Sequence, residues 1–330
     1  MKKILAFIFL FNSLYGMAQN TFVVSKNPAN NSSDAVWFET FKEAHDAASP
    51  NDIILMMGAG AAYGTDDTIK KPLIIYGPGY HLGDNPNPPA TSTAPAKLGK
   101  VVIHSDGAGT FISGVQIEGI LYIQADDCIV QRNRIRAVSI QNVNTLILGQ
   151  NYVYSYNIYN AVGAIDINNS DNILIQNNYL YGGNNMPSIR GYSSISAIIQ
   201  YNIIIYRLSV FNSVVSNNVI LGGAVSTSST SNNNYTNNVF LDDFDESTVG
   251  GTGNVSNAGA LADVFVNTGS DDGKWQLKDG FTPTDVGMFA GQDPYILSGI
   301  SGIPYIYELH LPTNVAGDNL NGTVKVRTNN

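Results

Sequence analysis

Acidic side chains are the first residues of this chain that could do chemistry. They occur as the pair Asp126-Asp127, as the single residue Asp166, and as the run DDFDE at 242–246. Carboxylates can hold a calcium ion, and two or three that face one another can act as acid and base. Asp166 is the candidate for such a role because it stands between two isoleucines, which predicts an outward-facing side chain on a strand. The other acids fall at expected turns, and no column of acids recurs along the chain.

Tyrosines and arginines form a second group with a defined spacing. Aromatic rings stack on the apolar faces of sugars, and arginine can bind a uronate carboxylate through two hydrogen bonds. The other interpretation is that the tyrosines pack on one another as cross-strand neighbours and only stabilise the fold. The residues that would bind a ligand are Arg134, Arg136, Tyr152, Tyr154, Tyr179 and Tyr181.

The composition indicates an all-β protein with a large core. Of the 330 residues, 44% are hydrophobic and only 13% are charged. The net charge of −9 disfavours nucleic acid and anionic membranes as partners. The single cysteine, Cys128, excludes an internal disulfide and is expected to be a small buried hydrophobe. No metal-ligand spacing or phosphate-binding loop occurs, so the sequence predicts no resident metal.

The first 18 residues predict a secretory signal peptide. Lys2 and Lys3 precede an apolar run from Ile4 to Leu14, and small residues at 16 and 18 suit cleavage after Ala18. The run is too short for a transmembrane helix, so we expect export without membrane insertion. Cleavage would remove two of the 17 basic side chains and none of the 26 acidic ones, which gives a net charge of −11.

Asparagines inside apolar runs recur with a near-constant spacing. Successive members of the series are separated by 18, 27, 24, 16 and 20 residues, with a mean of 21. Self-similarity at this period predicts a solenoid. The residue two positions after each asparagine is apolar every time, which indicates a strand, a bend and another strand in each repeat. The series is Asn133, Asn151, Asn178, Asn202, Asn218 and Asn238.

Two physical reasons favour asparagine at the bend. Its side chain tolerates left-handed backbone angles better than most, and stacked carboxamides can hydrogen-bond from one coil to the next. We therefore interpret the series as an internal structural ladder. About 20 residues a turn fits three short strands with their bends.

Positions one and three after each asparagine are expected to point outward, and in the later repeats they are aliphatic. Soluble proteins rarely leave such a patch bare. We expect the chain's own tail, around Tyr295 to Leu309, to lie on it, with a protein partner as the alternative. The patch comprises Ile203, Ile205, Val219, Leu221, Val239 and Leu241.

The two ends carry a resemblance to a known superfamily. Residues 37–58 predict a helix with a Thr40/Glu43 capping box and then a strand, which suits a lid over the open end of a solenoid. The segments KEAHDAASPNDIILMMGAGAAYG, VGMFAGQDPY, LSGISGIPYIYEL and TVKVRTNN are similar to those of secreted β-helix proteins from Bacteroidota. The chain thus resembles the pectin-lyase-like superfamily, which implies a right-handed parallel β-helix with an N-terminal capping helix.

This superfamily hosts lyases, hydrolases, adhesins and other proteins, so the resemblance leaves the activity open. The chain is predicted to be secreted, at the cell surface or in the periplasm, and to present a surface to a carbohydrate or another envelope component. The first alternative is a polysaccharide lyase or glycoside hydrolase, and calcium would be a cofactor only for a lyase. The second alternative is a structural or assembly component.

The same observations divide the chain into four parts. They are a signal peptide (1–18), an N-terminal cap with the first coils (19–100), a β-helix body with the asparagine ladder (101–270), and a last coil with a tail that packs on the solenoid (271–330).

Overall fold

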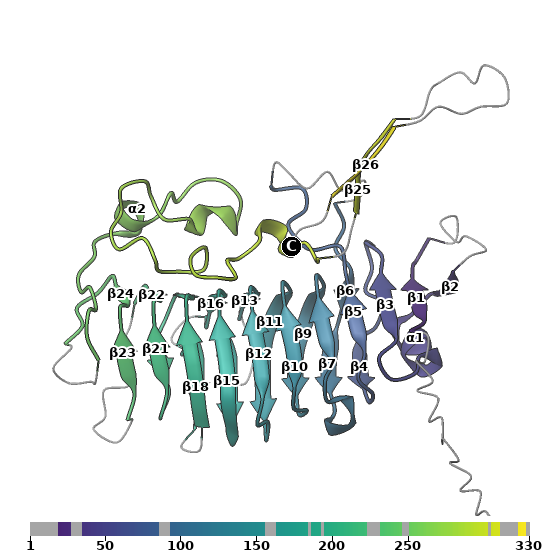
Figure 1. Ribbon diagram of the computed structural model, residues 1–330, viewed down its shortest axis with the longest axis horizontal. Coiled ribbons are helices and arrows are strands. Elements are labelled where there is room, and N and C mark those ends of the chain that lie inside the picture. The colour runs from purple at the N-terminus through teal and green to yellow at the C-terminus, as the bar shows by residue number, and fades with distance from the viewer. Residues whose placement is uncertain are drawn as a thin grey trace, which may run out of the picture.

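Short strands joined by bends stack coil upon coil along one axis (Figure 1). The computed structural model describes residues 19–27, 35–85, 93–155, 163–183, 186–192, 195–222, 232–245 and 251–302, with the backbone of two further strands. The predicted signal peptide lies outside the described residues.

One sheet runs the length of the rod and faces the viewer in Figure 1. Within the described residues it has 11 strands, and every neighbouring pair is parallel. Their order is β2 (Val36–Phe38), β1 (Thr21–Val24), β3 (Ile53–Met56), β5 (Ile74–Tyr76), β8 (Phe111–Ser113), β10 (Cys128–Gln131), β12 (Leu146–Gly149), β15 (Ser170–Gln176), β18 (Ile195–Gln200), β21 (Val214–Ser216) and β23 (Asn234–Thr236).

The second sheet, with 13 described strands, forks half-way along the rod. Its undivided part contains β4 (Asp66–Ile69), β6 (Lys97–Leu98), β7 (Lys100–Ile103), β9 (Gln116–Ile123) and β11 (Arg134–Gln141). One branch contains β13 (Tyr152–Tyr154), β16 (Tyr179–Tyr181), β19 (Ile203–Ile204), β22 (Val219–Ile220) and β24 (Val239–Phe240). The other branch contains β14 (Ile165–Asn168), β17 (Ile189–Gly191) and β20 (Leu208–Ser209).

The protein is therefore a parallel β-helix, as the repeat predicted. Inward residues of both sheets fill one continuous core of aliphatic side chains, because each strand alternates between buried and outward positions. Cys128 belongs to this core and is 1% exposed, as expected. Burial raises the pKa of its thiol to about 11, so the thiol is unreactive.

The N-terminal end of the solenoid is closed by helix α1 (Phe41–Ala47). Its predicted capping box is present: the Glu43 N–H donates to Thr40 Oγ1 (3.2 Å), and the Thr40 N–H donates to Glu43 Oε2 (3.1 Å). Phe41 and Ala44 are buried against the first coils. His45 is buried, and its Nε2 accepts a hydrogen bond from the Lys70 N–H (3.1 Å).

The six asparagines form the predicted internal ladder. Each carboxamide nitrogen donates to the carboxamide oxygen of the next asparagine at 2.9 to 3.2 Å, and Asn254 extends the series by one coil. The left-handed bend, however, belongs to the residue before each ladder asparagine. These residues, with φ between 54° and 57°, are Arg132, Gln150, Asn177, Tyr201, Asn217 and Asn237.

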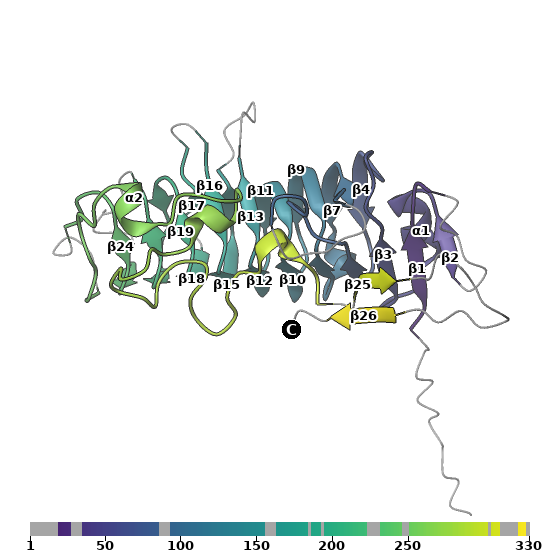
Figure 2. The ribbon, with the colours of Figure 1, turned by 90° about the horizontal axis from the view of Figure 1, so that it is seen from above.

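Residues 258–301 leave the last coil and return along the rod, where they lie over β24, β22, β16 and β13 (Figures 1 and 2). We call this segment the cover. It contains helix α2 (Leu261–Val264) and short 3₁₀ turns at Gly273–Trp275 and Leu297–Gly299. The boundary predicted at residue 271 falls inside it.

The residues with left-handed φ that precede the ladder asparagines form a column, which we call the left-handed column. Side chains of this column bind backbone groups of the cover. Asn177 Nδ2 donates to the carbonyls of Met288 (3.0 Å) and Ala290 (2.7 Å), and Asn217 Nδ2 donates to that of Asp285 (2.8 Å). Gln150 and Arg132 bind the carbonyls of Asp293 and Ile300 in the same way. The Tyr201 hydroxyl, in the turn between Asn177 and Asn217, donates to Asp285 Oδ2 (3.2 Å), so five consecutive turns hold the cover.

Beyond the cover, β25 (Tyr305–His310) and β26 (Thr323–Arg327) pair as an antiparallel hairpin. In the part of the chain that the structure describes, no helix has the length and apolar character needed to cross a membrane.

Candidate functional site

The fork of the second sheet positions most of the residues that the sequence singled out. The first half of β11 pairs with β13, and its second half pairs with β14. The corner between the two branches therefore lies between Tyr154 and Asp166 in one coil and between Tyr181 and Arg190 in the next.

Tyrosine and arginine side chains alternate at the corner. The guanidinium carbon of Arg134 lies 4.2 Å from the ring centroid of Tyr154, a cation–π contact. The rings of Tyr181 and Tyr206 lie 5.4 Å apart, and all of these side chains except Arg207, which is exposed, are half-buried. We define the fork surface as Arg134, Arg136, Tyr154, Tyr181, Arg190, Tyr206 and Arg207.

Asp166, the predicted catalytic candidate, faces outward but is engaged in an ion pair. Arg190, its register partner on β17, donates from Nη2 to Asp166 Oδ2 (2.5 Å) and from Nε to Asp166 Oδ1 (3.1 Å). Asp166 Oδ1 also accepts a hydrogen bond from the Gly163 N–H (3.2 Å). The hydrogen bond to Asp166 raises the pKa of Arg190, so the guanidinium stays charged at physiological pH. An acid with both oxygens occupied in this way is a poor general acid or base.

Tyr152 and Tyr179 do not line an open surface. Each is 7% exposed, and their rings stack on one another with centroids 4.4 Å apart and an interplanar angle of 11°. Trp275 of the cover packs on Tyr179 (5.0 Å), and His81 packs edge-on against Tyr152 (5.4 Å). Burial raises the pKa of both phenols. For these two residues the packing interpretation holds, and they cannot stack on a sugar while the cover is in place.

The aliphatic patch from Ile203 to Leu241 is also beneath the cover, and its most inward members, Ile203, Val219 and Val239, are fully buried. Val264, Phe265, Val286 and Met288 supply the covering side chains. The expected intramolecular cover thus exists, but it comes from a segment that starts well before Tyr295. No partner can reach this patch without displacing the cover.

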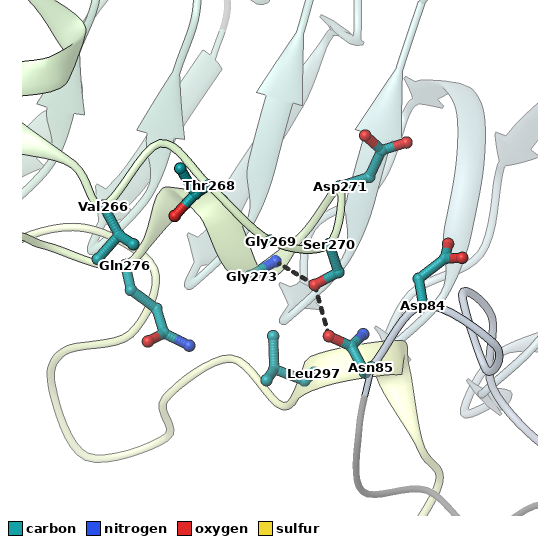
Figure 3. A pocket seen from close by; sticks show the side chains of 10 residues that line it. All are labelled: Asp84, Asn85, Val266, Thr268, Gly269, Ser270, Asp271, Gly273, Gln276 and Leu297. Carbon is teal, nitrogen blue, oxygen red and sulfur yellow. Dashed lines mark hydrogen bonds between the residues drawn. The ribbon is translucent and has the colours of Figure 1, made fainter.

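A cleft with a volume of about 660 Å³ opens between the two arms of the cover and the loop at Asp84-Asn85 (Figure 3). One wall is formed by residues of the segment 266–276 and the opposite wall by Leu297. In Figure 3, the carboxylates of Asp84 and Asp271 stand at one end, and Gln276 lies at the other. Asp84 binds His81 (3.1 Å), and Asp271 binds Lys274 (3.3 Å).

A buried hydrogen-bond network fixes the walls of the cleft. Ser270 Oγ donates to Asn85 Oδ1 (2.5 Å), and Asn85 Nδ2 donates to Ser298 Oγ (2.8 Å) and to Asp272 Oδ1 (2.9 Å). Asp272 is fully buried and also accepts hydrogen bonds from the Ser298 N–H (2.7 Å) and the Tyr295 hydroxyl (3.2 Å). Asn85 is thereby joined to two segments of the cover that lie more than 180 residues away in sequence.

Sequence reasoning missed several residues of both regions. Arg190 and Tyr206 were not singled out because Arg190 lies in β17 and Tyr206 in a connection, both outside the asparagine repeat. Asp84 precedes a proline-rich stretch that follows no repeat, and nothing in the sequence links it to residue 271. Within the described residues, no group of three His, Cys, Asp or Glu side chains is placed to hold a metal ion.

The parallel strand pairing and the asparagine ladder define a parallel β-helix protein. Among solved structures, the chain is similar to a mutant of the PL6 family alginate lyase AlyGC, with 12% sequence identity and a TM-score of 0.29. The likeness covers 91% of this chain and 60% of that protein, so this chain spans less than two thirds of its length. No protein-family profile matches the sequence, and no curated protein is detectably similar to it.

Proposed function

We propose that this protein binds an acidic polysaccharide across the fork surface, outside the cytoplasm and after removal of residues 1–18. The supporting observation is the concentration of cations in an otherwise acidic chain. The sequence holds six arginines, and four of them, Arg134, Arg136, Arg190 and Arg207, belong to the fork surface. Arginine binds carboxylates through paired hydrogen bonds, and the interleaved tyrosines offer ring faces to the sugars.

The geometry suits a polymer better than a small molecule. Neighbouring strands of each branch are about 4.8 Å apart along the rod, which is close to the advance of one sugar unit along an extended glycan. Tyr154 and Tyr181 are register partners on adjacent strands and so present equivalent groups to successive sugars.

The test is a binding titration of residues 19–330 with polygalacturonate and alginate, compared with a neutral glucomannan. We expect the acidic polymers to bind and the Tyr181→Ala and Arg136→Gln variants to lose about tenfold in affinity, or ~1.4 kcal/mol each. Tyr76→Ala is the matched aromatic control, since Tyr76 is half-buried on the outer face of the other sheet. Lys42→Gln on α1 is the matched cation control.

Equal affinity for neutral and acidic polymers would contradict the proposal, as would a Tyr76→Ala loss as large as that of Tyr181→Ala. The same incubations separate binding from catalysis. New unsaturated ends that require calcium would make the protein a lyase, and saturated reducing ends would make it a hydrolase. The ion pair of Asp166 disfavours both alternatives, and the cover disfavours an assembly role through the aliphatic patch.

A further inference from the structure

We propose that the cleft between the cover and the Asp84-Asn85 loop is a second binding site, specific for a neutral sugar unit. Its volume of about 660 Å³ lies in the range of small-molecule sites, which is about 300 to 1,000 Å³. The proposal stands on the cleft alone and does not depend on the function of the fork surface.

The lining has the mixture of groups that recognises hydroxyl-rich rings. Asp84 and Asp271 can each accept hydrogen bonds from sugar hydroxyls, and the Gln276 carboxamide can both donate and accept. Val266, 44% exposed, and Leu297 provide apolar surface for the C–H face of a ring. A few polar groups around an apolar contact are typical of specific small-molecule sites.

The charge of the lining disfavours acidic sugars. None of the residues that line the cleft is basic, the carboxylates of Asp84 and Asp271 are 56% and 60% exposed, and Lys274, which pairs with Asp271, does not line the cleft. A uronate would place a third negative charge beside these two, and each repulsion at 4 Å is worth about 1 kcal/mol even in water. The cleft and the fork surface therefore have opposite charge preferences.

The walls are fixed before any ligand arrives. Ser270 is held between Asn85 and the Gly273 N–H (3.0 Å), and Asn85 is anchored on the buried Asp272. A Cβ on Gly273 would lie 2.6 Å from Ser270 Oγ, so only glycine allows this arrangement. Such preorganisation reduces the entropy that a ligand must lose on binding.

Trp275 provides a reporter beside the cleft. It does not line the cleft, but it precedes the lining residue Gln276 in sequence and packs on Tyr179 and Phe265. The chain has two tryptophans, so a Trp37→Phe background leaves Trp275 as the only tryptophan emission. The probes are cello-, manno- and xylo-oligosaccharides, with oligogalacturonate as the acidic counterpart.

We expect at least one neutral probe to change the Trp275 emission at millimolar concentration, and oligogalacturonate to bind at least about tenfold more weakly. Gln276→Ala and Asp271→Asn should each weaken the neutral probe about tenfold, whereas Asp279→Asn, an exposed acid of the cover outside the cleft, should not. The double variant Asp84→Asn/Asp271→Asn should reduce the discrimination against oligogalacturonate, and Tyr181→Ala should leave neutral-probe binding unchanged.

Three results would overturn the proposal: no neutral probe binds, oligogalacturonate binds as tightly as the neutral probes, or Gln276→Ala and Asp271→Asn bind like the parent. Failure of the fork-surface proposal would be seen in a different experiment, the polygalacturonate titration, if none of the fork-surface variants bound that polymer more weakly than the parent.

Discussion

Two adjacent positions at each bend have different structural roles in the solenoid. The ladder position accepts and donates hydrogen bonds within the column, whereas the position before it adopts left-handed φ and turns its side chain outward. Asparagine fills both positions at 177–178, 217–218 and 237–238. Arg132, Gln150 and Tyr201 show that the left-handed position accepts other residues, while asparagine fills the ladder position in every coil from Asn133 to Asn254.

The first prediction concerns the ladder. Asn178→Ala removes the oxygen that accepts from the Asn151 N–H (2.8 Å) and from Asn151 Nδ2 (3.1 Å). The N–H is then buried without a partner, Nδ2 keeps only the Val130 carbonyl (2.8 Å), and the Leu148 carbonyl loses its bond from Asn178 Nδ2 (2.9 Å). Since each buried unsatisfied group costs about 1–3 kcal/mol, we expect a loss of about 3 kcal/mol or more in the free energy of unfolding. Urea unfolding measures this loss. Asn168→Ala, at an exposed strand position, should change stability by less than about 0.5 kcal/mol, and an equal loss in both variants would refute a special role of the ladder.

The second prediction concerns Asp67, which is buried with Oδ2 unpartnered among the described residues. Burial, with the nearby Asp66 carboxylate adding to it, raises the pKa of Asp67 from 3.8 to about 6. The folded state therefore binds the proton more tightly than the unfolded state, and stability is lost as the pH rises between these two values. Relative to Asp67→Asn, the wild type should gain up to about 3 kcal/mol when the pH falls from about 7 to about 4. Parallel pH dependences of urea unfolding for the two proteins would show the expected shift to be absent.

At the scale of elements, the cover is held by two different kinds of contact. Apolar side chains such as Trp275 and Met288 bury the outward face of one branch, and the left-handed column binds the cover's carbonyl groups. The N–H of Gly287 donates back to the carbonyl of Asn217 (2.9 Å), and a Cβ at this glycine would lie 3.3 Å from Val219. This close approach at φ 78° explains why glycine stands there.

The third prediction separates the cover's attachment from backbone strain. Asn177→Ala and Asn237→Ala place alanine at nearly the same φ, 54° and 55°, but only Asn177 binds the cover. We expect Asn177→Ala to cost about 1–3 kcal/mol more than Asn237→Ala, because the carbonyls of Met288 and Ala290 lose a buried donor. Hydrogen exchange of residues 285–301 should accelerate in Asn177→Ala alone. Equal exchange in both variants would mean that the apolar contacts alone hold the cover.

At the scale of the whole molecule, the stacked coils could be predicted from the sequence, but the path of the cover could not. Period-two alternation and the asparagine spacing are local signals that predicted a solenoid and its ladder, and the Thr40/Glu43 capping box predicted the helix at its end. The path of residues 258–301 depends on contacts such as Asn85 with Asp272, which are 187 residues apart and follow no period. For the same reason the sequence predicted that Tyr152 and Tyr179 could bind a ligand, although Trp275 packs on Tyr179 and His81 packs on Tyr152.

The fourth prediction follows from the stacking of coils that mainly contact their neighbours. In such solenoids stability is the sum of nearest-neighbour terms, so coils at an end open more easily than central ones. The cover adds contacts over β13 to β24, and α1 closes the N-terminal end. We expect the slowest hydrogen exchange in β10 to β18 and faster exchange in β23 and residues 251–256. Exchange of all strands at one common rate would contradict nearest-neighbour stacking.

The residues with left-handed φ tie the spacing of the coils to the spacing of backbone carbonyls along the cover. Asn217, Asn177, Gln150 and Arg132 belong to four of five consecutive coils, and the carbonyls of 285, 288, 290, 293 and 300 are spaced to meet them. Because these contacts are made to backbone groups of the cover, they constrain its length, whereas its apolar side chains are constrained separately by the branch that they bury. A duplication that added one coil would separate the left-handed residues beyond it from the cover carbonyls that they bind, unless the cover gained residues as well. Growth of this molecule therefore requires paired insertions, one in the coils and one in the segment that returns over them.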